Sequence, residues 1–432
     1  MVRVKIGLVF IGVEDISMGW PYRGFDIHSE AERVKNGLLY YSKTHGVDVD
    51  FEPFLVSTME EFENVKSKLS KMDGIVAVYL TTDVGHILRK IVEMGVPTLI
   101  FAQPLSGHEW SLYSMFKAEG VKTAIVATDD LSILADKVKL LEVLGRLKGL
   151  KLLVFRDKPY GDEVVELFRS RVGVDIVQRS HEEVLKYYEK VDVGEAEKVA
   201  DLVISKASEI VEPSRNDIVK AARMYIALRD ALRDYKANAL AIDCLDFIVR
   251  DLIPITPCLA LSMLNDQGVP AACEADLDSL LTMVILRMLY DKPSFISDPV
   301  PDFKNNVIIH AHCTSATKMR GFVEIGEKYA LRNHSETLSG VSIQVYMSKN
   351  VTVTVGKIVL WGNMVLAHKG TIVDNIRSER GCRTKFAVKV KDVRKFVENF
   401  KGGLHRVVVY GDYLEDLEDL AKLMGLRYVL EI

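Results

Sequence analysis

The sequence predicts an α/β fold in which two doubly wound parallel-sheet domains are followed by a β-rich C-terminal domain. Apolar runs alternate with amphipathic helical patterns at first, the same alternation restarts after residue 118, and short strands separated by turns dominate after residue 299. Apolar strands separated by helices indicate parallel sheets with right-handed crossovers. We therefore expect domains at residues 1–117, 118–298 and 299–432.

The first domain opens with a strand. The segment from Met1 to Gly12 is too short and too strand-like to be a signal peptide. Each later apolar run is followed by a segment with apolar residues at helical spacing. The expected elements are the strand Val4–Phe10, the helix Ser29–His45, the strand Val47–Pro53, the helix Thr58–Met72, the strand Gly74–Tyr79, the helix Val84–Met94 and the strand Pro97–Ala102.

The second domain repeats this architecture without repeating the sequence. Its expected strands are Lys122–Ala127, Lys151–Phe155, Val174–Gln178 and Ala239–Ile242, and its expected helices are Ser132–Leu147, Glu163–Arg171, His181–Tyr188, Ala196–Ser205 and Arg215–Tyr235.

The C-terminal domain is rich in Thr, Val and Ile and in turn residues, which indicates a mostly antiparallel structure. Its expected strands are Val307–Cys313, Val341–Met347, Val351–Ile358, Met364–Lys369, Lys385–Val390 and Arg406–Tyr410, followed by a helix at Leu414–Met424 and a last strand at Arg427–Ile432.

Composition excludes several classes of function. The 432 residues are 48% hydrophobic and 27% charged, with a formal net charge of −4, so no global basic field favours nucleic acid or an anionic membrane. No apolar run reaches the roughly 18 residues that a membrane span needs. Five cysteines, an odd number, without a signal sequence favour reduced thiols and a cytoplasmic location. A basic run is expected to be a solvated face: Lys385, Lys389, Lys391, Arg394 and Lys395.

Carboxylates at the start of an apolar helix mark the candidate site. The helix Leu277–Tyr290 is apolar nearly all round and must be buried, so Glu274, Asp276 and Asp278 lie in or near the interior. Helix N-termini stabilise anions, and strand-to-helix junctions of α/β sheets bind ligands. Asp276 or Asp278 alone is equally well explained as an N-cap. Glu274 has no obvious capping duty.

A further acid and two histidines follow. Asp298 ends an expected short strand before Pro299, although Asp-Pro also marks ordinary turns. His310 and His312 share one face of the strand Val307–Cys313. Carboxylates and imidazoles suit Mn²⁺, Mg²⁺ or Co²⁺. Cys244, Cys258, Cys273 and Cys313 offer an alternative zinc site, but they contain no C-x₂-C pair and are simply interpreted as small apolar packers. No G-x-G-x-x-G, Walker or G-x-S-x-G motif is present.

The ordered set of segments Ala272–Asp276, Ser294–Asp298 and Ile308–Cys313 resembles the L-fucose and L-arabinose isomerases, and most closely their shorter L-fucose isomerase-like relatives. The resemblance implies two flavodoxin-like domains before the β-rich domain, Mn²⁺ or a similar metal, and aldose–ketose interconversion through an enediol. In fucose isomerases two acids that hold the metal and move protons lie 24 residues apart, and they match Glu274 and Asp298 (298 − 274 = 24).

The resemblance leaves the third metal ligand open. A late His-His segment supplies it in the family, and here that segment reads His405-Arg406, so the ligand is His405, His312 or absent. An arginine at 406 suggests pairing with an anionic substrate group. His310, His334 and Glu336 are candidates for binding sugar hydroxyls. The family also implies a homo-oligomer (trimer or hexamer) with its site between subunits, where Trp110 is a candidate for contacting the sugar.

Three alternatives remain at this point. Two α/β domains around a cleft also occur in sugar-binding proteins. A different metal-dependent enzyme, acting on a modified or anionic sugar, fits the same residues. A nucleotide-dependent oxidoreductase is disfavoured by the missing glycine motif. The sequence therefore predicts a metal-dependent isomerase of a pentose or 6-deoxyhexose, with Glu274 and Asp298 as catalytic residues and as metal ligands alongside His312 and His405.

Overall fold

The computed structural model describes residues 3–16 and 18–432 and confirms the predicted fold class: two parallel sheets of alternating strands and helices, then a six-stranded antiparallel barrel. Met1 and Val2, at the start of the predicted first strand segment, lie outside the described residues. The chain divides into two compact units, Met1–Lys148 with Glu415–Tyr428 and Gly149–Leu414 with Val429–Ile432. The domain borders at 117/118 and 298/299 stay predictions. Within the described residues, no helix is long and apolar enough to span a membrane.

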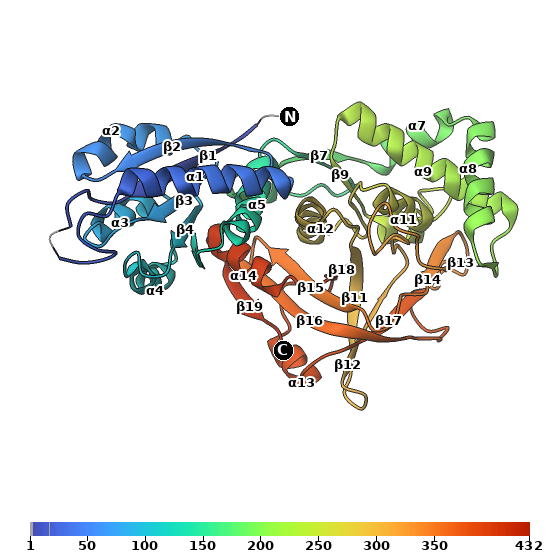
Figure 1. Cartoon of the computed structure of the whole chain (residues 1–432). Helices are drawn as coiled ribbons and strands as arrows, with labels where there is room; N and C mark the ends of the chain where they lie inside the picture. Colours follow the sequence, from blue (N-terminus) through green and yellow to red (C-terminus); the bar gives the residue numbers. More distant parts are fainter. Residues whose placement is uncertain (1–2, 17) are drawn as a thin grey trace. The chain divides into compact units, whose positions relative to one another are not determined.

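The first unit contains a five-stranded parallel sheet with strand order β2-β1-β3-β4-β5 (Figure 1, blue). Strand β3 is buried along its whole length, as expected for a strand covered by helices on both faces. The sheet includes β5, which pairs with β4. The elements of this unit are β1 (Val4–Ile11), α1 (Ile27–Thr44), β2 (Val49–Val56), α2 (Met59–Leu69), β3 (Gly74–Tyr79), α3 (Gly85–Glu93), β4 (Thr98–Ala102), α4 (Glu109–Glu119), β5 (Thr123–Ala127), α5 (Leu131–Leu147) and most of α14 (Leu414–Leu423).

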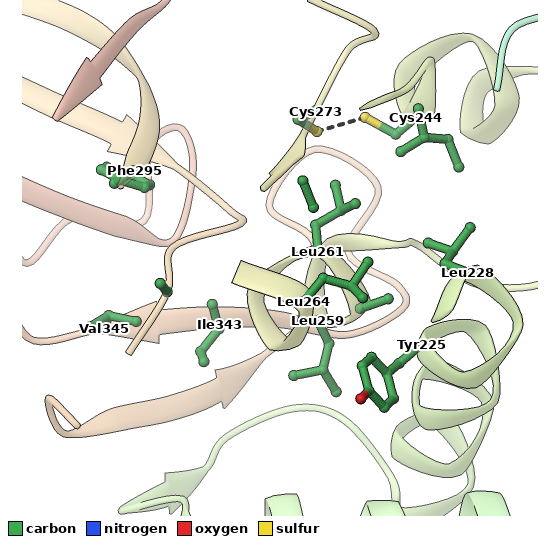
Figure 2. Close-up of a cluster of buried hydrophobic side chains, with 14 of the residues drawn as sticks. Tyr225, Leu228, Cys244, Leu259, Leu261, Leu264, Cys273, Phe295, Ile343 and Val345 are labelled. Atoms are coloured by element: carbon green, nitrogen blue, oxygen red, sulfur yellow. Dashed lines mark hydrogen bonds between the residues drawn. The ribbon is translucent and has the colours of Figure 1, made fainter. Parts of the chain in front are cut away.

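The second unit begins with a four-stranded parallel sheet, β10-β9-β6-β7. Helix α11 packs its leucines between α9 and strand β14 of a small neighbouring sheet, β14-β13-β8 (Figure 2). The elements are β6 (Lys151–Phe155), α6 (Asp162–Val172), β7 (Asp175–Arg179), α7 (His181–Lys190), α8 (Val193–Lys206), β8 (Glu209–Ile210), α9 (Arg215–Tyr235), β9 (Ala239–Ile242), α10 (Cys244–Val249), α11 (Cys258–Asp266), β10 (Ala271–Ala272), α12 (Leu277–Tyr290), β13 (Tyr329–Arg332) and β14 (Ser342–Val345).

The β-rich region forms a closed barrel (Figure 1, yellow to red). Its strands follow the order β15-β18-β11-β12-β17-β16, and β16 pairs back to β15, which leaves no open edge between them. Strand β19 lies beside β16. The elements are β11 (Phe295–Asp302), β12 (Val307–His312), β15 (Thr352–Val359), β16 (Met364–Asn375), β17 (Thr384–Lys389), α13 (Val393–Asn399), β18 (Arg406–Tyr410) and β19 (Arg427–Leu430).

A buried ion pair fixes the start of β18. Arg406 and Glu431 are both 0% exposed, and the guanidinium donates to the carboxylate at 2.7 Å. The remaining N–H groups of Arg406 donate to the carbonyl oxygens of Lys401, Gly403 and His405. A buried charge with all its donors used is stable only while its partner is present. The pair therefore holds the chain segment that carries His405.

Replacing Glu431 by alanine tests whether the Arg406–Glu431 ion pair stabilises the fold. Because the substitution leaves the Arg406 charge buried without its carboxylate, we expect a loss of roughly 3–5 kcal/mol in the free energy of unfolding. The matched control is Asp412→Ala, which breaks the half-exposed Lys369–Asp412 pair of the same barrel, at 2.6 Å, and is expected to cost at most about 1 kcal/mol. Chemical denaturation followed by circular dichroism measures both, and equal losses would contradict the assignment.

Candidate functional site

The turn between β10 and α12 positions Glu274. Glu274 and Ala275 both have left-handed backbone conformations, with φ of 56° and 50°, which are uncommon for residues other than glycine. The N–H of Ala275 donates to the carbonyl of Ile242 at 3.0 Å, and its own carbonyl accepts from the hydroxyl of Tyr160. Residues held in such conformations cluster at functional sites. The turn leaves the Glu274 side chain 31% exposed.

Barrel strands supply the other three side chains. Asp298 lies within β11, which runs on through Pro299 rather than ending at Asp298 as expected. Beyond Ser297 the strand pairs with β12 alone, and prolines are tolerated on such a free edge. His312 is the last residue of β12, and His405 directly precedes β18.

These four side chains, Glu274, Asp298, His312 and His405, form the acid–histidine cluster. The Nε2 atom of His405 lies 3.4 Å from Oε2 of Glu274 and 3.5 Å from Oδ1 of Asp298. Nε2 of His312 lies 3.6 Å from Oε1 of Glu274. All three separations exceed the 2.7–3.2 Å of ordinary N–H···O hydrogen bonds. The acids and imidazoles of the cluster therefore lie at ion-pair distance but are not joined by ordinary hydrogen bonds.

The unpaired atoms of the cluster fit a metal ion. Oδ1 of Asp298, both ring nitrogens of His312 and Nε2 of His405 are buried and make no hydrogen bond within the described residues. Buried polar atoms without partners are costly, and each needs an explanation. Ligand atoms of Asp298, His312 and His405 all lie within 4.8 Å of one another. Donors about 2.1 Å from one octahedral ion lie about 3 to 4.2 Å apart, so the atoms are close to a ligating arrangement.

Asp276 orients His405. Its Oδ2 lies 2.9 Å from Nδ1 of His405 and 2.6 Å from Nζ of Lys357, while Asp276 also caps α12 through the N–H of Ser279. A carboxylate on one imidazole nitrogen directs the other nitrogen toward a metal, as in carboxylate–histidine–metal arrangements. The structure thus confirms Asp276 as the N-cap and gives it a second contact.

The pKa values of the two acids of the cluster shift in opposite directions. The imidazoles of His312 and His405 hold the pKa of Glu274 well below its usual range, although burial opposes them. Burial raises the pKa of Asp298, and the nearby histidines only partly offset it. Burial lowers the pKa of His405, but Asp276 and Glu274 outweigh it and raise that pKa to about 9. The carboxylates around His405 therefore favour its protonated imidazolium form.

The other predicted site residues form no ion pair with the four side chains of the cluster among the described residues. His310 is fully buried, with Nδ1 2.8 Å from the Ser297 hydroxyl. His334 is buried, with Nδ1 3.2 Å from the Thr337 hydroxyl. Arg406 is committed to Glu431 and three carbonyls. Trp110 lies on α4 of the first unit and is 62% exposed. Their predicted contacts with substrate stay predictions.

Sequence reasoning missed Lys357 and the pairing of Asp276 with His405. Lys357 is 3% exposed within strand β15, all of whose residues after Thr352 are buried. A single lysine in such a strand signals a buried ion pair, because an unpaired charge there is too costly. Nothing in the sequence indicates that its partner is Asp276, which lies 81 residues earlier.

Two buried cysteines, Cys244 and Cys273, lie close to the acid–histidine cluster. Cys244 and Cys273 lie with their sulfur atoms 2.7 Å apart (Figure 2). Cys273 also forms a group with Glu274 and His312 whose ligand atoms lie within 4.8 Å of one another. The neighbouring Cys244 thiol and burial raise the pKa of Cys273 well above its usual value. Cys273 thus lies next to the acid–histidine cluster, with its thiol in contact with that of Cys244.

Asp278, in the first turn of α12, gives a test of these electrostatics. Burial and then the nearby Asp276 raise its pKa from 3.8 to about 7. The folded protein thus binds more protons than the unfolded chain between about pH 4 and pH 7, so this residue makes stability fall as pH rises through that window. Asp278→Asn should lose less stability than the wild type between pH 5 and pH 8, measured by thermal unfolding. Parallel pH profiles would contradict the burial of an ionisable Asp278.

The chain is similar to sulfoquinovose isomerases. It is 22% identical to that of Priestia aryabhattai over 419 residues, which covers 86% of this chain and 89% of that protein. It is 26% identical to that of Clostridium sp. (strain MSTE9) over 301 residues, or 66% of each chain. No family model matches. Among solved structures, an ABC transporter solute-binding protein from Burkholderia multivorans is 13% identical; the match covers 59% of this chain and 86% of that protein, with a TM-score of 0.21. The chain is a distant homologue of sugar isomerases; its closer relation to L-fucose isomerases stays a prediction.

Proposed function

We propose that this protein is a divalent-metal-dependent aldose–ketose isomerase that acts on an anionic sugar. The observation that carries the proposal is the acid–histidine cluster: two carboxylates and two imidazoles, several of whose buried atoms have no partner, in a distant homologue of sulfoquinovose isomerases. Sulfoquinovose is a sugar that bears a sulfonate. The relatives therefore support the anionic-sugar alternative better than the neutral pentose or 6-deoxyhexose that the sequence resemblance favoured.

Glu274, Asp298, His312 and His405 are the residues that would hold the metal. Oxygen and imidazole donors suit Mn²⁺, Mg²⁺ or Co²⁺. When bound, such an ion polarises the carbonyl and hydroxyl oxygens of the open-chain sugar. Asp276 keeps His405 in the orientation that leaves Nε2 free, through the 2.9 Å contact at Nδ1.

The carboxylates would move the proton between C1 and C2 by way of an enediol. One takes the proton from carbon and one returns it to the adjacent carbon, which is general acid–base catalysis. Their environments differ: Glu274 has a lowered pKa and stays ionised, whereas burial raises the pKa of Asp298. Asp298 is therefore the better proton carrier of the two. We further propose a cytoplasmic homo-oligomer without nucleic-acid or membrane partners.

A direct assay tests the proposal. The Mn²⁺-loaded protein should convert sulfoquinovose to the corresponding ketose, detected by NMR, and it should lose this activity after chelation. Glu274→Gln removes a charge that the mechanism requires, so kcat should fall by about 10²- to 10⁴-fold while the circular dichroism spectrum is unchanged.

The matched control is Glu398→Gln, on the exposed face of α13 in the same unit, which should retain wild-type activity. Neutral pentoses and 6-deoxyhexoses complete the substrate panel and separate the two sugar classes. No ketose from any sugar, with metal present, would refute the isomerase proposal; full activity of Glu274→Gln would remove that residue from the mechanism.

A further inference from the structure

Lys385 departs from the solvated basic face that the sequence predicted. Four members of that basic run are exposed: Lys389, Lys391, Arg394 and Lys395. Lys385 is 7% exposed. A lysine so deeply buried ordinarily has a carboxylate partner, because desolvating its charge is costly.

No carboxylate among the described residues forms an ion pair with Lys385. Its ammonium group donates to the carbonyl oxygen of Cys382, a neutral acceptor. Among the described residues, the other four buried lysines and arginines all have carboxylate partners: Arg332 with Glu212, Lys357 with Asp276, Arg383 with Glu379, and Arg406 with Glu431. Burial lowers the pKa of Lys385, which shows the same desolvation. The ammonium group of Lys385 is therefore available to bind an anion.

Strand register places Lys385 beside the acid–histidine cluster. Asp298 of β11 lies opposite Ala311 of β12, and Ala311 lies opposite Lys385 of β17. Directly opposed residues of antiparallel strands project from the same face, so the three side chains form one row. One face of the barrel thus carries a catalytic acid and, two strands away, a buried cation.

The spacing matches an open-chain hexose with a terminal anionic group. Two strand spacings amount to about 9.5 Å between the backbones of Asp298 and Lys385. Five C–C bonds of about 1.5 Å carry C6 to roughly 6–7 Å from C1 in an extended chain. A sulfonate or phosphate on C6 extends further, within reach of a lysine side chain. C1 and C2 at Asp298 therefore bring the anionic end of the sugar toward Lys385.

We propose that Lys385 is the specificity residue that binds the sulfonate or phosphate group at the end of the sugar remote from C1 and C2. This inference rests on the proposed isomerase function and names its substrate class, a hexose with a terminal oxyanion. It also assigns to Lys385 the role that the sequence suggested for Arg406, whose donors are used by Glu431 and by backbone carbonyls.

The test compares Lys385→Met, which keeps the side-chain length and removes the charge, with Lys389→Met. Lys389 is the matched control, since it lies on the same face of β17, is exposed, and likewise donates to one backbone carbonyl, that of Asn305 at 2.7 Å. Calorimetry on the Mn²⁺-loaded proteins measures binding of sulfoquinovose, glucose 6-phosphate and glucose. Steady-state kinetics with the same three sugars give the ratio of kcat/KM for anionic over neutral substrate.

Lys385→Met should weaken binding of an anionic sugar by about 10- to 100-fold, the value of one charge-assisted hydrogen bond, and lower the anionic-to-neutral ratio equally. Lys389→Met should change neither quantity, and Lys385→Arg, which keeps the charge, should recover part of the loss. Preference for one of the two anionic sugars identifies sulfonate or phosphate as the natural group. If wild type binds anionic sugars no more tightly than glucose, or if Lys385→Met keeps the full preference, the inference is wrong. Anionic sugar that binds through Lys385 but is never isomerised would instead refute the proposed function alone.

Discussion

The second unit brings two carboxylates and two imidazoles together, although several of their buried atoms have no hydrogen-bond partner among the described residues. This cluster is the main constraint on the structure around it. Glu274 and Asp298 approach His405 at 3.4 and 3.5 Å, which is ion-pair distance but longer than an ordinary hydrogen bond. Such an arrangement is costly in a protein interior unless a cation completes it. The segments that carry these groups have unusual backbone: a left-handed turn at Glu274, a proline after Asp298, and Gly402 and Gly403, both with positive φ, shortly before His405.

Two ion pairs, Asp276–Lys357 and Arg406–Glu431, stabilise the chain segments around the cluster. Asp276 joins the N-terminus of α12 to Lys357 of β15 and to His405, so one carboxylate ties a helix of the α/β layer to the barrel. On the other side of the backbone, Arg406 is fixed by Glu431 near the end of the chain. Neighbouring residues of one segment therefore serve opposite purposes: His405 is directed to the cluster, and Arg406 anchors the segment.

Local pattern was enough to predict the fold class and to select the acids. The apolar helix Leu277–Tyr290 made Glu274, Asp276 and Asp278 conspicuous, because carboxylates beside a buried helix need a reason. The alternation of strands and helices, then the change to turn-separated strands, indicated the two parallel sheets and the antiparallel region. Closure of that region into a barrel could not be read from sequence, since it depends on the pairing of β15 with β16.

Features that depend on contacts between residues far apart in the sequence could not be predicted. Lys385 belongs to a basic run that ordinarily faces water, and only the register of β11, β12 and β17 places it in a row with Asp298. The alternative ligands His312 and His405 could not be separated by sequence, and both approach the acids in the structure. Arg406 suggested an anion site by its charge alone, but no sequence pattern indicates that Glu431, 25 residues later, is its partner.

Anomalous diffraction at the manganese absorption edge, from crystals grown with Mn²⁺, shows whether the acid–histidine cluster binds a metal ion. We expect one strong peak within about 2.0–2.4 Å of carboxylate oxygens of both Glu274 and Asp298, with an imidazole nitrogen of His312 or His405 completing the site. If saturating Mn²⁺ gives no peak at the cluster, or gives its peak elsewhere in the protein, metal binding by these residues is contradicted.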